Sequence, residues 1–130
     1  AAVSVLLAED DPINQLVGRE MLKMLGCEVD VVDDGAAACA AVRTGRYDLV
    51  FMDCHMPVMD GGETIKRIRN SGELWKDIPV IALTVDAMRG DKERYLAMGM
   101  SDYISKPVDS RELAAKYVSL LRGVAAKNAA

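Results

Sequence analysis

Short apolar runs alternate along the chain with longer segments in which apolar residues recur at helical spacing. The runs are largely apolar rather than alternating, which is typical of strands buried on both faces of a parallel sheet. They predict strands at 3–8, 29–32, 49–52, 78–84 and 103–104. The segments between them predict helices at 13–25, 36–44, 63–69, 88–98 and 111–122. This repeated order of strand and helix predicts an α/β fold, a parallel sheet with helices on both faces.

Turn and capping residues mark the ends of these helices. Asp11 is expected to cap the first helix, Pro12 suits its first turn and Gly26 suits its end. Helical spacing places a set of apolar residues on one face of that helix: Ile13, Val17, Met21, Met24 and Leu25. Asp109 or Ser110 should cap the last helix. We expect a single domain over 1–130, with a core at about 3–122 and a frayed tail or linker at 123–130.

Composition narrows the class of protein. The chain is 51% hydrophobic, as globular proteins are, and its net charge of -4 predicts no basic face for nucleic acid. No apolar stretch approaches the roughly 18 residues that a membrane-spanning helix needs, and the first residues lack the basic start of a signal peptide. The cysteines show no C-x-x-C spacing, so they indicate neither a disulfide framework nor a zinc site. They fit a reducing compartment, and we expect a cytoplasmic location.

Polar residues stand where the predicted strands end. In an open parallel sheet, ligands bind beyond the carboxyl ends of the strands, where the strand order reverses. The residues found at these ends are Glu9, Asp10 and Asp11, then Asp53, then Thr84, then Lys106 with Pro107. Several carboxylates, a hydroxyl and an ammonium group are therefore expected to converge on one edge of the sheet.

Carboxylates packed together repel one another unless a cation lies between them. A set of oxygen ligands without histidine or cysteine side chains favours a hard ion such as Mg²⁺. A cation, a lysine and a threonine hydroxyl around a carboxylate are the groups that phosphoryl transfer requires. The carboxylate itself can accept a phosphoryl group.

The polar residues at the strand ends lie in four short motifs, which are AEDD, MDCHMPVMDG, ALT and DYISKP. Together these motifs resemble those of the receiver domain of two-component signalling, and the resemblance covers about 3–121. The stretches PINQLVGREML and GMSDYISKP are most similar to receivers of hybrid histidine kinases. The resemblance implies a doubly wound, flavodoxin-like (βα)5 fold whose five strands lie in the order 2-1-3-4-5.

The resemblance also implies roles for the residues at the strand ends. Asp53 would be the phosphoryl acceptor, and Asp10 and Asp53 would bind Mg²⁺ together with the backbone carbonyl of His55. Glu9 would orient a water molecule bound to the metal. Lys106 would pair with the acidic cluster and then with the phosphoryl group.

Further roles concern the response to phosphorylation. Thr84 would donate its hydroxyl to a phosphoryl oxygen, and Tyr103 would turn inward as Thr84 moves. The peptide bond between Lys106 and Pro107 is often cis in this family. Val85 stands where the family usually has a small residue, so it is expected to narrow access to the site. Cys54 is expected to be a small core residue rather than a nucleophile.

The resemblance implies signal transduction rather than a conventional enzyme, although a receiver assists its own phosphorylation and dephosphorylation. The expected partner is a histidine kinase or a histidine phosphotransfer protein, docking on Ile13 and Leu16. The chain could belong to a hybrid histidine kinase. We expect a monomer when unphosphorylated, and neither nucleic acid nor membrane as a partner of this segment.

Three alternatives stay open. A phosphatase of the haloacid-dehalogenase type also forms an aspartyl phosphate. Such enzymes require a second aspartate two residues beyond the nucleophile, and in this sequence that position is His55. A flavodoxin-like module shares the topology, but the sequence EDDPIN is acidic where its phosphate-binding loop would lie. A receiver-like domain that only binds partners is distinguished from a competent receiver by an assay of phosphorylation.

Overall fold

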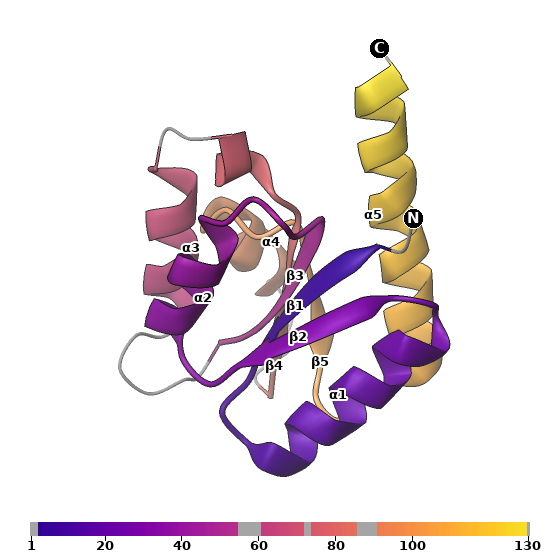
Figure 1. Cartoon of the computed structure of the whole chain (residues 1–130). Helices are drawn as coiled ribbons and strands as arrows, with labels where there is room; N and C mark the ends of the chain where they lie inside the picture. The colour runs from indigo at the N-terminus through magenta and orange to yellow at the C-terminus, as the bar shows by residue number, and fades with distance from the viewer. Residues whose placement is uncertain (1–2, 55–60, 72–73, 86–90, 130) are drawn as a thin grey trace.

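The computed structural model describes residues 3–54, 61–71, 74–85 and 91–129. A parallel sheet of five strands in the order β2-β1-β3-β4-β5 lies between two layers of helices (Figure 1). The strands are β1 Ser4–Ala8, β2 Glu28–Val32, β3 Leu49–Asp53, β4 Val80–Thr84 and β5 Asp102–Ser105. The helices are α1 Pro12–Met24, α2 Gly35–Val42, α3 Gly61–Arg69, the short 3-10 helix η1 Leu74–Asp77, α4 Asp91–Ala97 and α5 Ser110–Ala129. The predicted fold class and strand order are confirmed.

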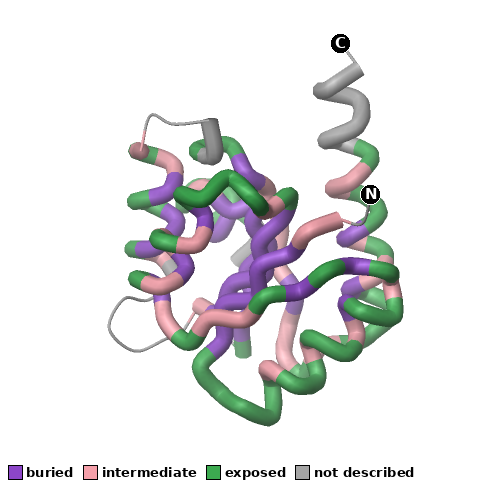
Figure 2. The backbone as a smooth tube through the Cα atoms, in the orientation of Figure 1, coloured by how far each residue is buried: buried purple, intermediate pink, exposed green. Residues whose placement is uncertain are grey.

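Side chains from alternate positions of each strand enter two separate cores. On one face of the sheet, Leu6 and Met52 pack with residues of α2, α3 and α4. On the other face, Leu7 and Phe51 pack with residues of α1 and α5. Figure 2 shows the resulting pattern, in which the central strands are buried along most of their length. Phe51 is fully buried, and most of the remaining core is aliphatic.

The first turn of α1 forms as the sequence predicts. Asp11 Oδ1 accepts hydrogen bonds from the backbone N–H groups of Ile13 at 2.8 Å and Asn14 at 3.3 Å. Pro12 occupies the first turn, where a missing N–H costs nothing. Beyond the end of the helix, Gly26 adopts a φ of 87°, a conformation that favours glycine.

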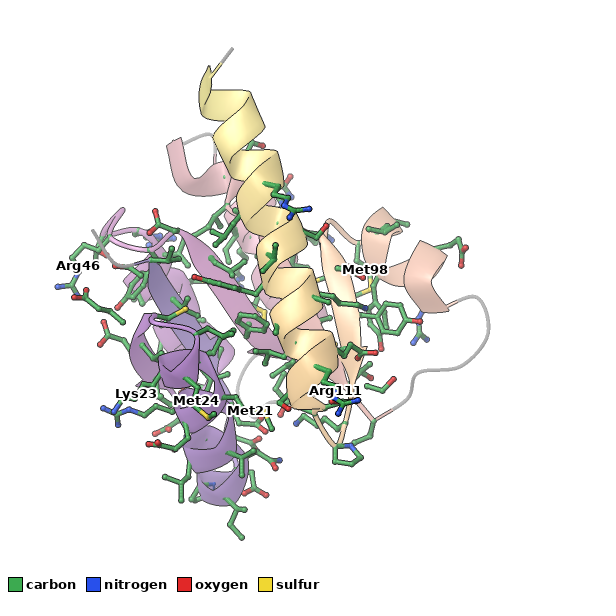
Figure 3. The ribbon with its side chains drawn as sticks, turned by 90° about the vertical axis from the view of Figure 1, so that its right-hand side faces the viewer. Met21, Lys23, Met24, Arg46, Met98 and Arg111 are labelled. Carbon is green, nitrogen blue, oxygen red and sulfur yellow. The ribbon has the colours of Figure 1, made fainter. Side chains whose placement is uncertain are left out.

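The apolar face predicted for α1 packs on the sheet only in part. Ile13, Val17 and Met24 are exposed, whereas Leu22 is buried against the core. Figure 3 shows Met21, Lys23 and Met24 on α1, which lies on the same side of the sheet as α5. Met21 and Leu25, which belong to the predicted face, are partly buried and pack against the same core, so helical spacing located this face only in part.

The ends of several elements differ from the prediction. β4 begins at Val80 rather than at 78, because η1 and Pro79 precede it and proline has no N–H to donate to a ladder. The predicted start of α4 at 88 lies outside the described residues, and the helix is described from Asp91. α5 continues past Arg122 to Ala129, through a segment rich in the good helix former alanine. The peptide bond between Lys106 and Pro107 is cis, as expected.

Among the described residues, no helix has the length and apolar character that crossing a membrane requires.

Candidate functional site

The carboxyl ends of four neighbouring strands bring the predicted polar residues together. Glu9 and Asp10 follow β1, Asp53 ends β3, Thr84 ends β4 and Lys106 follows β5. Backbone hydrogen bonds hold these ends in register: the Lys106 N–H donates to the Thr84 carbonyl at 2.7 Å. The strand order reverses between β1 and β3, so the acidic residues lie at the point where open α/β sheets bind ligands.

The acidic cluster consists of Glu9, Asp10 and Asp53. Carboxylate oxygens of the three residues all lie within 4.8 Å of one another. Glu9 and Asp53 are buried, with 1% and 4% of their surface exposed, whereas Asp10 is open to solvent. Glu9 Oε2 is buried and receives no hydrogen bond from the described residues. Crowded carboxylates with a buried oxygen that lacks a donor fit a hard cation such as Mg²⁺.

Lys106 provides the positive charge of the site. Its Nζ donates a hydrogen bond to Glu9 Oε1 at 2.8 Å and lies 3.3 Å from Asp53 Oδ2. Burial alone would lower the pKa of Lys106, but the hydrogen bond to Glu9 and the charge of Asp53 raise it. The ammonium group therefore stays charged between the two carboxylates.

The pKa of Glu9 lies well above its ordinary value. Burial raises its pKa from 4.5 to about 7, and the neighbouring Asp53 adds to the rise, while Lys106 opposes it. Apolar side chains surround the carboxyl: Glu9 and Lys106 line a cavity of about 160 Å³ together with Leu7, Phe51 and Leu83. A single ammonium group does not balance the cluster, so the site has a deficit of positive charge.

Thr84 is fully buried at the end of β4. Its Oγ1 accepts a hydrogen bond at 2.9 Å from the hydroxyl of Tyr95, which lies on α4. Tyr95 also packs against Tyr103, with ring centroids 5.7 Å apart. The structure thus connects Thr84 to Tyr103 through Tyr95.

Tyr103 has a second neighbour, Lys116 of α5. The Lys116 Nζ lies 4.6 Å from the Tyr103 ring centroid and donates a hydrogen bond to the Tyr103 carbonyl. The same ammonium forms an ion pair with Asp102 at 3.1 Å. These contacts tie the half-buried Tyr103 to α5.

Two functional candidates were not foreseen from the sequence. Tyr95 was missed because it follows a run of charged residues at 91–94, which is typical of a solvated helix face. Gln15 was missed although it lies in the motif that follows the acidic residues. Its Nε2 donates to the Glu9 carbonyl at 2.6 Å and to Asp33 Oδ1 at 2.7 Å. A polar residue in the first turns of α1, close behind the acidic loop, was the available signal.

The other predicted residues have different outcomes. His55 lies outside the described residues, so its expected carbonyl ligand stays a prediction. Val85 follows Thr84 and is 66% exposed, and Pro107 is also exposed. Cys54 is half-buried, and burial raises the pKa of its thiol to about 11. A thiol that holds its proton at neutral pH is a poor nucleophile, as the sequence suggested.

Residues 5–118 match the family described as response regulator receiver domain. The chain therefore belongs to this family of two-component signalling domains. It is 40% identical over 129 residues to the sensor histidine kinase GacS of Pseudomonas protegens. That match covers 98% of this chain and 14% of the relative, so the chain spans a small part of the relative's length.

Solved receiver domains share the fold. The receiver domain of sensor histidine kinase PA1611 from Pseudomonas aeruginosa PAO1 is 43% identical with a TM-score of 0.80, over 88% of this chain and 93% of that one. That structure has a magnesium ion coordinated in its active-site cleft. The receiver domain of Ssk1 from Saccharomyces cerevisiae, crystallised with the phosphotransfer protein Ypd1, is 30% identical with a TM-score of 0.79, over 88% and 86% of the two chains. The predicted family and its likeness to receivers of sensor kinases are confirmed.

Proposed function

We propose that Asp53 accepts a phosphoryl group from a phosphohistidine in a Mg²⁺-dependent reaction. The observation that carries this proposal is the position of Asp53, buried at a strand end with its Oδ2 3.3 Å from Lys106 Nζ. A bond forms between phosphorus and an Asp53 oxygen while the bond between phosphorus and the histidine nitrogen breaks. The imidazole keeps the electron pair of the broken bond.

The cluster would hold the ion through Asp10 and Asp53, with Glu9 acting through water and the His55 carbonyl as a further ligand. Bound Mg²⁺ would neutralise charge on the phosphoryl oxygens. The arrangement supports this role because three carboxylates lie close together and Lys106 pairs with two of them, Glu9 and Asp53. The magnesium ion in the PA1611 receiver supports the same choice of cation.

The remaining residues would act on the transferred group. Lys106 lies near enough to pair with a phosphoryl oxygen on Asp53, because its ammonium already contacts that carboxylate. Thr84 would donate its hydroxyl to another phosphoryl oxygen. The new negative charge would draw Thr84 toward Asp53, and Tyr103 would follow.

The proposed donor is a histidine kinase or a histidine phosphotransfer protein. The co-crystal of Ypd1 with the Ssk1 receiver supports a partner of this kind. Ile13 and Leu16 are 72% and 61% exposed on α1, and they follow directly from the acidic loop. An apolar surface beside the site suits docking, and alanine at both positions should slow transfer from a protein donor. We further propose a cytoplasmic location and a monomeric state before phosphorylation.

Intact-mass spectrometry tests the proposal directly. The chain is incubated with a phosphorylated phosphotransfer protein and Mg²⁺, and parallel samples contain a chelator. Asp53→Asn removes the acceptor, and Asp30→Asn is the matched control because Asp30 lies on the exposed edge strand β2. We expect the wild type and Asp30→Asn to gain one base-labile phosphoryl group, only with Mg²⁺, and Asp53→Asn to gain none.

A wild type that gains nothing from several donors would instead support a domain that only binds partners. Modification that persists in Asp53→Asn would place the acceptor elsewhere.

A further inference from the structure

The hydroxyl of Tyr95 donates a buried hydrogen bond to Thr84 Oγ1. The hydrogen bond is 2.9 Å long, and the two residues are 4% and 0% exposed. A buried hydroxyl that loses its partner carries a desolvation penalty, so this bond resists being broken. Tyr95 belongs to α4 and Thr84 to β4, so the bond joins a helix to the edge of the phosphorylation site.

The surroundings of Tyr95 hold its ring in place. The Arg94 guanidinium carbon lies 5.0 Å from the Tyr95 ring centroid, and its Nη2 donates to the Tyr95 hydroxyl at 3.3 Å. The phenol oxygen therefore accepts from Arg94 and donates to Thr84, so the hydroxyl has a partner on each side. The Tyr103 ring packs against the same tyrosine. Tyr95 is therefore an anchored donor rather than a freely rotating one.

Movement of Thr84 conflicts with this anchoring. The proposed function draws the Thr84 hydroxyl toward a phosphoryl group on Asp53, which lies on the neighbouring strand β3. Such a movement lengthens the bond to Tyr95 unless α4 moves as well. A contact that is present only in the unphosphorylated arrangement stabilises that arrangement, and its removal shifts the equilibrium toward the other one.

We propose that Tyr95 is a positioning residue that holds Thr84 in the unphosphorylated arrangement and couples α4 and Tyr103 to phosphorylation of Asp53. This inference rests on the proposed function. It predicts that loss of the Tyr95 hydroxyl makes switching easier, not harder. Tyr95→Phe keeps the ring and its contact with Tyr103 and removes the hydroxyl, together with its hydrogen bonds to Thr84 and from Arg94.

The test is a double-mutant cycle with two readouts. The variants are Tyr95→Phe, Thr84→Val and the double variant, and Tyr117→Phe is the matched control because Tyr117 is also a buried tyrosine but lies on α5. The first readout is urea unfolding of the unphosphorylated protein. The second is the affinity for beryllofluoride, a mimic of the phosphoryl group, in the presence of Mg²⁺. This binding is measured from the changes in the NMR signals of α4 and β5.

We expect the unfolding data to show coupling between positions 95 and 84. We also expect Tyr95→Phe to bind beryllofluoride roughly fivefold more tightly, which is the equilibrium equivalent of one ordinary hydrogen bond. The gain should vanish in the Thr84→Val background, and Tyr117→Phe should match the wild type.

Unchanged or weaker beryllofluoride affinity in Tyr95→Phe would overturn the inference, as would an equal gain in the Thr84→Val background. Absence of coupling in the unfolding data would overturn it without any reference to phosphorylation. If the wild type bound no beryllofluoride and accepted no phosphoryl group, the proposed function would fail and the inference with it. The wild-type result therefore separates the two failures.

Discussion

Lys106 Nζ and Glu9 Oε1 are 2.8 Å apart although 97 positions separate the two residues in the chain. The side chains are 15% and 1% exposed, so this is an internal ion pair rather than a surface one. β1 and β5 are not neighbours in the sheet, and Lys106 reaches the β1 end of the site past the ends of β3 and β4. The pair therefore depends on the assembly of β1, β3, β4 and β5.

Replacing Lys106 should affect both stability and phosphoryl transfer. Lys106→Met leaves Glu9 and Asp53 without their buried cation, and breaking a buried pair is strongly destabilising. We expect the free energy of unfolding to fall by at least about 1 kcal/mol above neutral pH. The loss should be smaller at acidic pH, because a protonated Glu9 no longer needs a cation. Phosphoryl transfer should fall on the order of a hundredfold.

Urea unfolding at the two pH values and single-turnover transfer measure these effects. Lys106→Arg, which keeps the charge, is the control for stability. Equal stability losses at acidic and alkaline pH would show that Glu9 is not the group that Lys106 compensates.

Glu9 should make the metal-free protein less stable as the pH rises. Its pKa is 4.5 in the reference state and about 7 in the folded protein, so the folded chain holds a proton that the unfolded chain has lost between these values. The contribution of this group to stability is complete below pH 4.5 and is lost as the pH passes through about 7. Urea unfolding across this range, with a chelator present, measures the slope.

Glu9→Gln should flatten this dependence because glutamine does not titrate. Added Mg²⁺ should restore stability mainly at the upper end of the pH range, where the carboxylates are charged and able to bind it. An unchanged slope in Glu9→Gln would assign the dependence to another group.

Val85 should limit phosphorylation by small donors. Its side chain is 66% exposed and directly follows Thr84 in the chain. Receiver domains usually have a small residue at this position. Val85→Ala is expected to raise the rate of phosphorylation by acetyl phosphate several-fold, because it removes two methyl groups at the mouth of the site. Transfer from a phosphotransfer protein is measured in parallel, to separate access from a change in the acceptor. Equal acetyl phosphate rates in the two proteins would remove this role from Val85.

Asp34 should contribute to stability as the cap of α2. Its Oδ1 accepts a hydrogen bond from the Ala37 N–H at 2.8 Å. Asp34→Ala should lower the free energy of unfolding by about 1 kcal/mol, the usual cost of losing an N-cap. Asp34→Asn keeps an acceptor oxygen and should retain most of the stability. Urea unfolding distinguishes the two variants, and equal losses would indicate that charge, rather than the cap, is responsible.

The sequence predicts the sheet and most of the site because both depend on local patterns. Apolar runs mark β1, β3 and β4, and shorter apolar segments mark β2 and β5. Glu9, Asp53, Thr84 and Lys106 each stand at or just after the end of one of these strands. The topology of parallel sheets then brings the strand ends together without any knowledge of side-chain positions.

Features that depend on the packing between helices and strands could not be predicted from the sequence. Leu22, rather than Ile13 or Met24, faces the core, and only the angle at which α1 meets the sheet decides this. The bond from Tyr95 to Thr84 likewise requires the placement of α4, which the spacing of charged residues around Tyr95 does not indicate. The end of α5 was misplaced because alanine favours a helix with or without packing against the core.

The outer edge of the sheet has a consequence for concentrated solutions. β2 ends the strand order, and it exposes Glu28 and Asp30 on either side of the buried Val29. A second copy pairing along this edge would bring its own carboxylates beside these. Charged residues on an edge strand oppose such pairing. The edge at β2 therefore resists pairing with a second copy and growth into extended β-assemblies.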